Sequence, residues 1–249
     1  MELQDAALLV LGGLTAGVVN TLAGGGSLLT VPLLVMLGLP GPVANGTNRV
    51  GIVIGSATAT WRLAAEGAPG LRDALPMILP SALGALLGAR IVVELPVEWF
   101  NRAFGVLMLV LLVPTLRASA SGSAAPAAPR APASPALRFA AFFAIGLYGG
   151  AFQAGVGVLL LSVLALAGND LIRSTQIKTA LNTCFTLLAL PVFAWAGQIA
   201  WPEALALGAG FAAGGAAGAR IAVRGGARAI KPMLAVAVVA LAGRMLGLY

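Results

Sequence analysis

The sequence predicts an all-helical protein embedded in a membrane, and two observations support this. Hydrophobic residues make up 59% of the 249 residues and charged residues only 9%, whereas a soluble domain carries about 25% charged residues. A chain so poor in polar side chains cannot cover its surface in water, so lipid must be its solvent. The apolar residues also gather into segments whose lengths suit helices that enter or cross a bilayer, at about 20 residues a crossing.

The apolar segments fall into two similar halves. In the first half they cover 6–22, 28–38, 43–64, 74–93 and 99–116, and in the second 138–153, 156–168, 171–196, 203–222 and 229–248. In each half, two shorter segments interrupted by glycine precede three longer ones. We therefore expect each half to form a broken helix pair followed by three long transmembrane helices.

A segment rich in alanine, proline and serine separates the halves. Its small side chains cannot build a hydrophobic core, so we expect 117–137 to be a linker. The predicted domains are a first transmembrane repeat over 1–116, this linker, and a second transmembrane repeat over 138–249.

Three sequence similarities between the halves indicate a duplication. They pair Gly84–Ile91 with Gly214–Ile221, Gly46–Asn48 with Ser174–Gln176, and Gly24 and Gly26 with Gly155 and Gly157. The pairs occur in the same order at separations between 128 and 131 residues. This regularity favours an internal repeat over chance similarity in sequence rich in glycine and alanine.

The basic residues predict how the chain is oriented. They lie around the loop near 65–73, in and beside the linker, and in the loop near 223–231, whereas the loops near 39–42 and 197–202 carry none. The positive-inside rule makes the basic loops cytoplasmic. The two termini then face the periplasm and the halves have opposite orientations, an inverted repeat as in many secondary transporters. Because the net charge of +7 is explained this way, we expect no nucleic-acid partner.

Composition also limits the chemistry that the chain can perform. It has no histidine and a single cysteine, Cys184, which excludes Ser-His-Asp and Cys-His catalysis and the common histidine metal sites. We therefore expect no catalytic residues, no metal and no cofactor, and the protein is predicted not to be an enzyme.

A glycine run marks the most informative local feature. Gly24-Gly25-Gly26-Ser27 separates two apolar segments, and Gln153 lies in the corresponding break of the second half. Freed backbone groups survive at membrane depth only where they are buried or face a cavity. A helix that starts after the break would point its positive dipole end at that cavity, which suits an anion. The alternative is a plain turn between two short helices.

Two buried cations support this interpretation. Arg49 and Lys178 lie roughly 9 Å inside long segments, at 1.5 Å per residue, and no Asp or Glu is at comparable depth in sequence. Charged side chains at such depth usually face a cavity or a partner. We expect an anionic substrate to be that partner, whereas snorkelling to the interface is the alternative.

The motifs resemble those of the TauE/SafE family, also known as DUF81. The first-repeat pattern spans Ala23–Leu34, Gly38–Pro40 and Ala44–Arg49, and a weaker second-repeat pattern spans Thr175–Asn182, which has fewer glycines than many members have. The resemblance covers nearly the whole chain. It implies a multi-spanning transporter in the bacterial cytoplasmic membrane, and characterised members are associated with export of sulfite or related sulfur-containing anions.

We therefore expect a secondary transporter for a small anion, with a site near the midplane between the repeats. The predicted substrate-binding residues are Asn20, Gly25, Ser27, Thr47, Asn48, Arg49, Gln153, Thr175, Gln176, Lys178 and Asn182. The expected partners are the anion, the lipid bilayer and a second copy of the chain. A membrane scaffold or receptor without transport activity is the alternative, and an intramembrane enzyme is a third class that the missing histidine disfavours.

Overall fold

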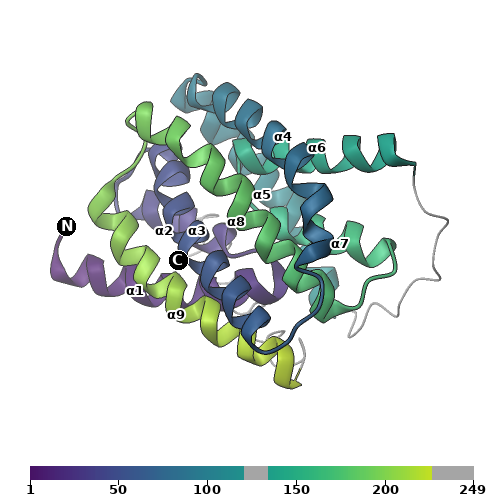
Figure 1. The fold of residues 1–249 in the computed structure, drawn as a ribbon. Helices are drawn as coiled ribbons and strands as arrows, with labels where there is room; N and C mark the ends of the chain where they lie inside the picture. The colour runs from purple at the N-terminus through teal and green to yellow at the C-terminus, as the bar shows by residue number, and fades with distance from the viewer. Residues whose placement is uncertain (121–133, 226–249) are drawn as a thin grey trace.

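A computed structural model describes residues 1–120 and 134–225, and this part of the chain is helical with no strand. The long helices and their short partners appear in Figure 1. They are α1 (Leu3–Ala23), α2 (Ser27–Met36), α3 (Gly41–Ala65), η1 (Arg72–Ala74), α4 (Leu75–Val93), α5 (Val97–Ala120), α6 (Pro135–Ala151), α7 (Val156–Leu166), α8 (Leu171–Trp195) and α9 (Trp201–Gly225).

The helices follow the predicted segments closely, with one correction. Residues 117–120 continue α5, and residues 135–137 already belong to α6, so the predicted linker is too wide at both ends. The early start of α6 has a local cause: Pro135 occupies its first turn, and the Ser134 side chain accepts a hydrogen bond from Leu137 N at 3.2 Å, a favourable N-terminal cap. The remainder of the linker and the predicted last segment, 229–248, lie outside the described residues.

Helix length and hydropathy confirm an integral membrane protein. Among the described residues four stretches are long and apolar enough to cross a bilayer: Leu3–Ala23, Arg72–Val93, Leu171–Trp195 and Trp201–Arg224. Helix α3 is equally long, at 25 residues, but carries too many polar side chains to qualify. Five of its polar residues, Asn45, Thr47, Asn48, Arg49 and Ser56, are buried inside the protein, so neighbouring helices and not lipid surround them.

Glycine faces allow two pairs of helices to pack backbone to backbone. Helix α1 lies along α9, and α4 lies along α6 (Figure 1). A Cβ atom at Gly84 would lie within 3.0 Å of the Phe143 carbonyl oxygen, and one at Gly214 equally close to the Leu14 carbonyl oxygen. Small residues at four-residue spacing permit such close approach, and Gly84 and Gly88 on α4 and Gly210, Gly214 and Gly218 on α9 have this spacing.

The first short helix folds back on its predecessor. A Cβ atom at Gly26 would lie 2.5 Å from Ala16 O, and one at Gly12 would lie 2.5 Å from the Leu33 side chain. These contacts run antiparallel, because the start of α2 meets the later part of α1 and its later part meets the middle of α1. The α1–α2 pair therefore enters the protein and returns to the side from which it came.

Contacts at the two ends of the bundle tie the halves together. At one end Gln198 Nε2 donates to Val93 O at 3.1 Å and Ala200 N donates to Thr47 Oγ1 at 3.0 Å. At the other end Arg173 pairs with Asp73 at 2.8 Å. Exposed tryptophans begin or end helices near the first of these ends: Trp99, Trp195 and Trp201. Tryptophan is enriched at membrane interfaces, so this end lies at a bilayer surface.

Candidate functional site

The breaks in the two helix pairs meet in the middle of the protein. Gly24, whose φ is 80°, caps the end of helix α1, and α7 begins after Gly155, whose φ is 64°. Both angles lie in the left-handed region that glycine adopts without a steric penalty. A Cβ atom at Gly24 would lie within 3.0 Å of the Gly157 backbone, and one at Gly157 equally close to Gly24. Two glycines are therefore required for this contact.

The three consecutive glycines of the first break have different surroundings. Gly24 lies against Gly157, and Gly26 lies against Ala16 and Asn20. Gly25 is buried, yet the one atom that a Cβ there would approach within 4 Å is Leu28 Cδ1, at 3.6 Å. A methyl group would therefore fit at Gly25 and not at Gly24 or Gly26.

Lys178 closes the end of α1 from the opposite half. Its side chain is 1% exposed, and its Nζ donates to Asn20 O at 2.8 Å and to Thr21 O. These carbonyl groups belong to the last turn of α1, where a helix runs out of its own N–H donors; Asn20 O also accepts from Gly24 N at 3.0 Å. A cation is favourable there because the C-terminal end of a helix is the negative end of its dipole.

Arg49 closes the end of α6 in the same way. It is fully buried, and its guanidinium donates to Gly149 O at 3.2 Å, to Gly150 O at 2.6 Å and to Ala151 O at 3.0 Å. The guanidinium also lies over the Phe193 ring, at 4.1 Å from its centroid. Each half thus supplies a cation to the broken helix of the other half, from equivalent positions on α3 and α8.

The structure shows which groups do and do not contact the two buried cations. No carboxylate is buried among the described residues, as expected. The sequence did not predict that helix-end carbonyl oxygens hold both cations. Carbonyl dipoles offset the cost of burying the charges only in part, since each oxygen carries a fraction of a unit charge.

A chain of buried side-chain hydrogen bonds joins three predicted site residues. Asn20 Nδ2 and Asn182 Nδ2 both donate to Ser56 Oγ, at 3.4 and 3.1 Å. Gln153 Nε2 donates to Asn182 Oδ1 at 2.8 Å, and Thr186 Oγ1 donates to Gln153 Oε1 at 3.4 Å. The chain runs from the end of α1 through α3 and α8 to the second break, so it crosses between the halves.

Gln153 occupies an unusual backbone conformation. Its φ is 61°, and it is the one non-glycine residue with positive φ in the part of the chain that the structure describes. Such a conformation costs about 1–2 kcal/mol for a residue with a side chain. Its buried amide donates to Asn182 and accepts from Thr186, both on α8, and these bonds hold it there; strained residues of this kind cluster at functional sites.

Polar groups without partners gather on α3. Asn48 Oδ1 accepts a hydrogen bond from Thr30 of α2, which places this residue beside the first turns of α2. Within the described residues, Asn48 Nδ2 and Arg49 Nε are buried donors that have no acceptor, and Asn45 Oδ1 is a buried acceptor that has no donor. Asn45 donates to Ala151 O at 2.9 Å, beside Arg49. Buried donors are rarely left unpaired, so these two are available to a ligand.

Other predicted residues lie outside this cluster. Thr47 accepts a hydrogen bond from Ala200 N at one end of the bundle. Thr175 bonds to Leu171 O within its own helix, and Gln176 reaches Thr60 O at 3.3 Å near the other end. Ser27, in contrast to these three, is buried in the first turn of α2, next to the break, and so belongs to the cluster. The cluster therefore holds Asn20, Gly25, Ser27, Asn48, Arg49, Gln153, Lys178 and Asn182.

Three participating residues were not predicted from the sequence. They are Asn45, Ser56 and Thr186. A usable signal was present, because each lies at helical spacing from a buried cation on its own helix: Asn45 and Ser56 flank Arg49 by four and seven residues, and Thr186 follows Lys178 by eight. Residues at these spacings share one face of a helix.

Comparison with known proteins agrees with this architecture. Residues 9–245 match the family described as sulfite exporter TauE/SafE. A probable membrane transporter protein of Sinorhizobium sp is 31% identical over 96% of this chain and 92% of its own length. A probable membrane transporter protein of Haemophilus influenzae is 27% identical over 92% of this chain and 90% of its own.

A third relative is also similar over most of both chains. The probable membrane transporter protein YfcA of Escherichia coli is 24% identical over 93% of this chain and 86% of its own length. No solved structure matches the chain. With its apolar helices and paired helix breaks, the chain is a multi-pass protein of the bacterial inner membrane. It belongs to the TauE/SafE family of membrane transporters.

Proposed function

We propose that the protein is a secondary transporter that carries a small anion, with sulfite or a related sulfur-containing organic anion as the substrate class. The single observation that supports an anion is the charge of the buried core. Arg49 and Lys178 are its two charged side chains among the described residues, and both are cations. The family description, sulfite exporter, supports the choice of sulfur anion.

The helix dipoles leave this positive balance unchanged. The ends of α1 and α6 each contribute about half a negative charge near the cations, and the starts of α2 and α7 each contribute about half a positive charge beside the same breaks. These four contributions cancel, so a charge of about +2 remains with no carboxylate to offset it. An anion that enters the core supplies the missing negative charge.

The unpaired donors suit an oxyanion in particular. Sulfite and sulfonate oxygens only accept hydrogen bonds, and Asn48 Nδ2 and Arg49 Nε are donors without acceptors in the described chain. Gly25, where an added Cβ atom would meet only Leu28 Cδ1 at 3.6 Å, lies at the start of α2, next to Ser27. We place the anion there, with the amides of Asn20, Gln153 and Asn182 around it.

We further propose that the two halves are inverted repeats. The support is reciprocal packing: α1 of the first half lies along α9 of the second, and α6 of the second lies along α4 of the first. The cationic side chains also reach across in both directions: Arg49 contacts the end of α6, and Lys178 contacts the end of α1. In transporters built this way the substrate site lies near the midplane at the interface of the repeats.

Uptake of labelled sulfite into proteoliposomes containing the purified protein tests the proposal. Arg49→Gln and Lys178→Gln should raise the half-saturating sulfite concentration about tenfold or more, since a charge-assisted hydrogen bond contributes roughly 1.5–3 kcal/mol. Arg49→Lys and Lys178→Arg keep the charge and should retain part of the flux. Arg90→Gln is the control, because Arg90 is exposed in its ion pair with Glu94.

A second measurement separates binding from structural support. Both Gln variants also leave carbonyl oxygens unpaired, so they lower thermal stability without sulfite whatever the substrate is. Binding of sulfite to the native state raises stability by RT ln(1 + [L]/Kd). If wild-type protein is not stabilised by sulfite, or if both Gln variants are stabilised as much as wild type, the two cations only cap helices and the anion site is wrong.

A further inference from the structure

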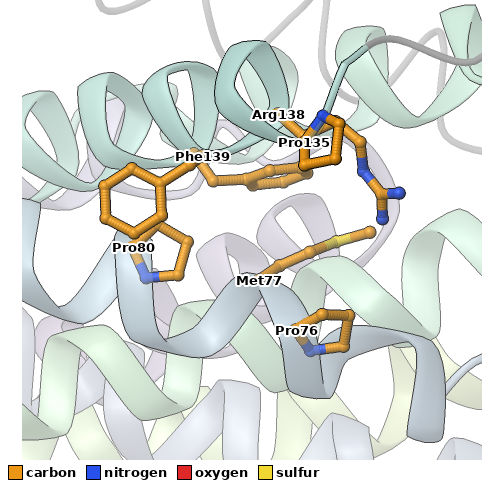
Figure 2. Close-up of a pocket in the computed structure, with 7 residues that line it drawn as sticks. Pro76, Met77, Pro80, Pro135, Arg138 and Phe139 are labelled. Atoms are coloured by element: carbon orange, nitrogen blue, oxygen red, sulfur yellow. The ribbon is translucent and has the colours of Figure 1, made fainter.

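A groove between α4 and α6 is separate from the helix breaks. Its volume is about 220 Å³, and it is lined by Pro76, Met77, Pro80, Pro135, Arg138, Phe139 and Phe142. All of these residues lie in the first turns of the two helices (Figure 2). Along α6, Phe142 is nine residues before the helix ends at Ala151, which is about 13 Å at 1.5 Å per residue.

The groove has an apolar floor and a stiff rim. Pro80 and Phe142 are buried beneath it, and Phe139 and Pro135 are exposed along its edge. Proline and phenylalanine offer no side-chain hydrogen bonds, and the proline rings hold their backbone angles fixed. The groove is therefore preformed and suits a hydrocarbon chain.

One guanidinium lies at the open end of the groove. Figure 2 shows the Arg138 side chain reaching from α6 between Pro135 and Met77. All eight Asp and Glu residues of the protein lie in the described part of the chain, and none of them pairs with Arg138. Helices α4 and α6 also both begin here, so two positive dipole ends point toward the same opening.

We propose that this groove binds an anionic glycerophospholipid of the surrounding bilayer. Arg138 donates to the phosphate, since a guanidinium matches two phosphate oxygens. One acyl chain lies along the floor formed by Met77, Pro80 and Phe142. A guanidinium beside an apolar floor fits an anionic lipid, which has both a phosphate and acyl chains. A free anion would make no contact with the apolar floor. A peptide would find a single polar side chain in the groove.

Native mass spectrometry of the detergent-purified protein tests this proposal. Wild-type protein is titrated with phosphatidylglycerol, and separately with phosphatidylcholine. Arg138→Gln should weaken phosphatidylglycerol binding about tenfold, consistent with loss of a charge-assisted contact. Arg138→Lys should give an intermediate affinity. The control is Arg102→Gln, because Arg102 is exposed and lies over Trp99 on α5, away from the groove.

A second variant addresses the floor. Met77→Trp fills the groove and should also weaken phosphatidylglycerol binding, while circular dichroism checks that the variant is folded. Equal affinities for phosphatidylglycerol in wild-type and Arg138→Gln protein would overturn the proposal. Displacement of phosphatidylglycerol by millimolar inorganic phosphate would also overturn it, because it would indicate a site for free anions. Concentration-dependent dimers in place of lipid binding would overturn it as well, because they would indicate a second copy of the chain in the groove. Lipid binding is measured without transport, so its failure leaves the proposed function untouched.

Discussion

The three glycines of the first break should respond differently to the same substitution. Gly24→Ala forces a methyl group into the Gly157 backbone and places alanine at φ 80°. Overpacking costs about 1–3 kcal/mol, and the left-handed conformation adds about 1–2 kcal/mol. We expect Gly24→Ala to lower the free energy of unfolding by roughly 2–5 kcal/mol, which is a large share of the stability of a typical domain.

The neighbouring positions provide matched comparisons. A Cβ at Gly26 would lie 2.5 Å from Ala16 O and 2.7 Å from Asn20 Cβ, so Gly26→Ala should cost about 1–3 kcal/mol from overpacking alone. A Cβ at Gly25 meets only Leu28 Cδ1, at 3.6 Å, an ordinary contact. Gly25→Ala should therefore change stability little, within about 0.5 kcal/mol.

Thermal unfolding in detergent, followed by circular dichroism, measures the stability of all three variants. Sulfite flux in proteoliposomes then separates packing from transport. If the anion passes beside Gly25, the well-folded Gly25→Val variant should lose most of its flux. Normal flux in a fully expressed Gly25→Val protein would show that the glycine run is only a turn. Equal stability losses at positions 24, 25 and 26 would refute the packing argument itself.

Three further predictions concern orientation, the strained residue and the ion pair between halves. Reporter fusions after Ser121 and Tyr249 should give opposite compartment readouts, with Ser121 cytoplasmic, and identical readouts would contradict the inverted repeat. Gln153→Ala loses the hydrogen bonds but keeps the unfavourable φ, so it should unfold about 1 kcal/mol more easily than Gln153→Gly; the reverse order in thermal unfolding would rule out backbone strain. Asp73→Asn breaks a partly exposed ion pair with Arg173 and should lower the free energy of unfolding by less than about 1 kcal/mol. Because the pair joins the halves, the substitution should nevertheless alter the rate of sulfite flux, and unchanged flux would show that the pair has no role in transport.

The helices could be predicted from the sequence because a bilayer favours helical structure in apolar segments. Apolar segments in lipid must satisfy their own backbone hydrogen bonds, so hydropathy and glycine breaks fix most helix limits within a few residues. The ends of the linker were harder to place. Alanine-rich sequence is compatible with both helix and linker, and the Ser134 cap and Pro135 outweighed its low hydrophobic bulk.

The burial of Arg49 and Lys178 was predictable from the sequence, but their hydrogen-bond partners were not. Depth and charge identified Arg49 and Lys178, and the glycines identified the breaks. No local pattern could show that Lys178 reaches α1 or that Arg49 reaches α6, because these contacts join residues that are 157 and 100 positions apart. For the same reason Thr47 and Gln176 were grouped with the cations by sequence proximity, although they point to opposite ends of the bundle.

If the protein carries an anion, as proposed above, the two cations that reach across the halves would link anion binding to movement. Lys178 of α8 is held by the end of α1, and Arg49 of α3 is held by the end of α6. A rocking motion of one half against the other must lengthen at least one of these contacts, and doing so leaves a buried cation without its acceptors. An anion beside the breaks supplies substitute acceptors at that moment. Under the proposed function, its negative charge would lower the energy of the moving state more than that of the resting state, and movement without an anion would be disfavoured.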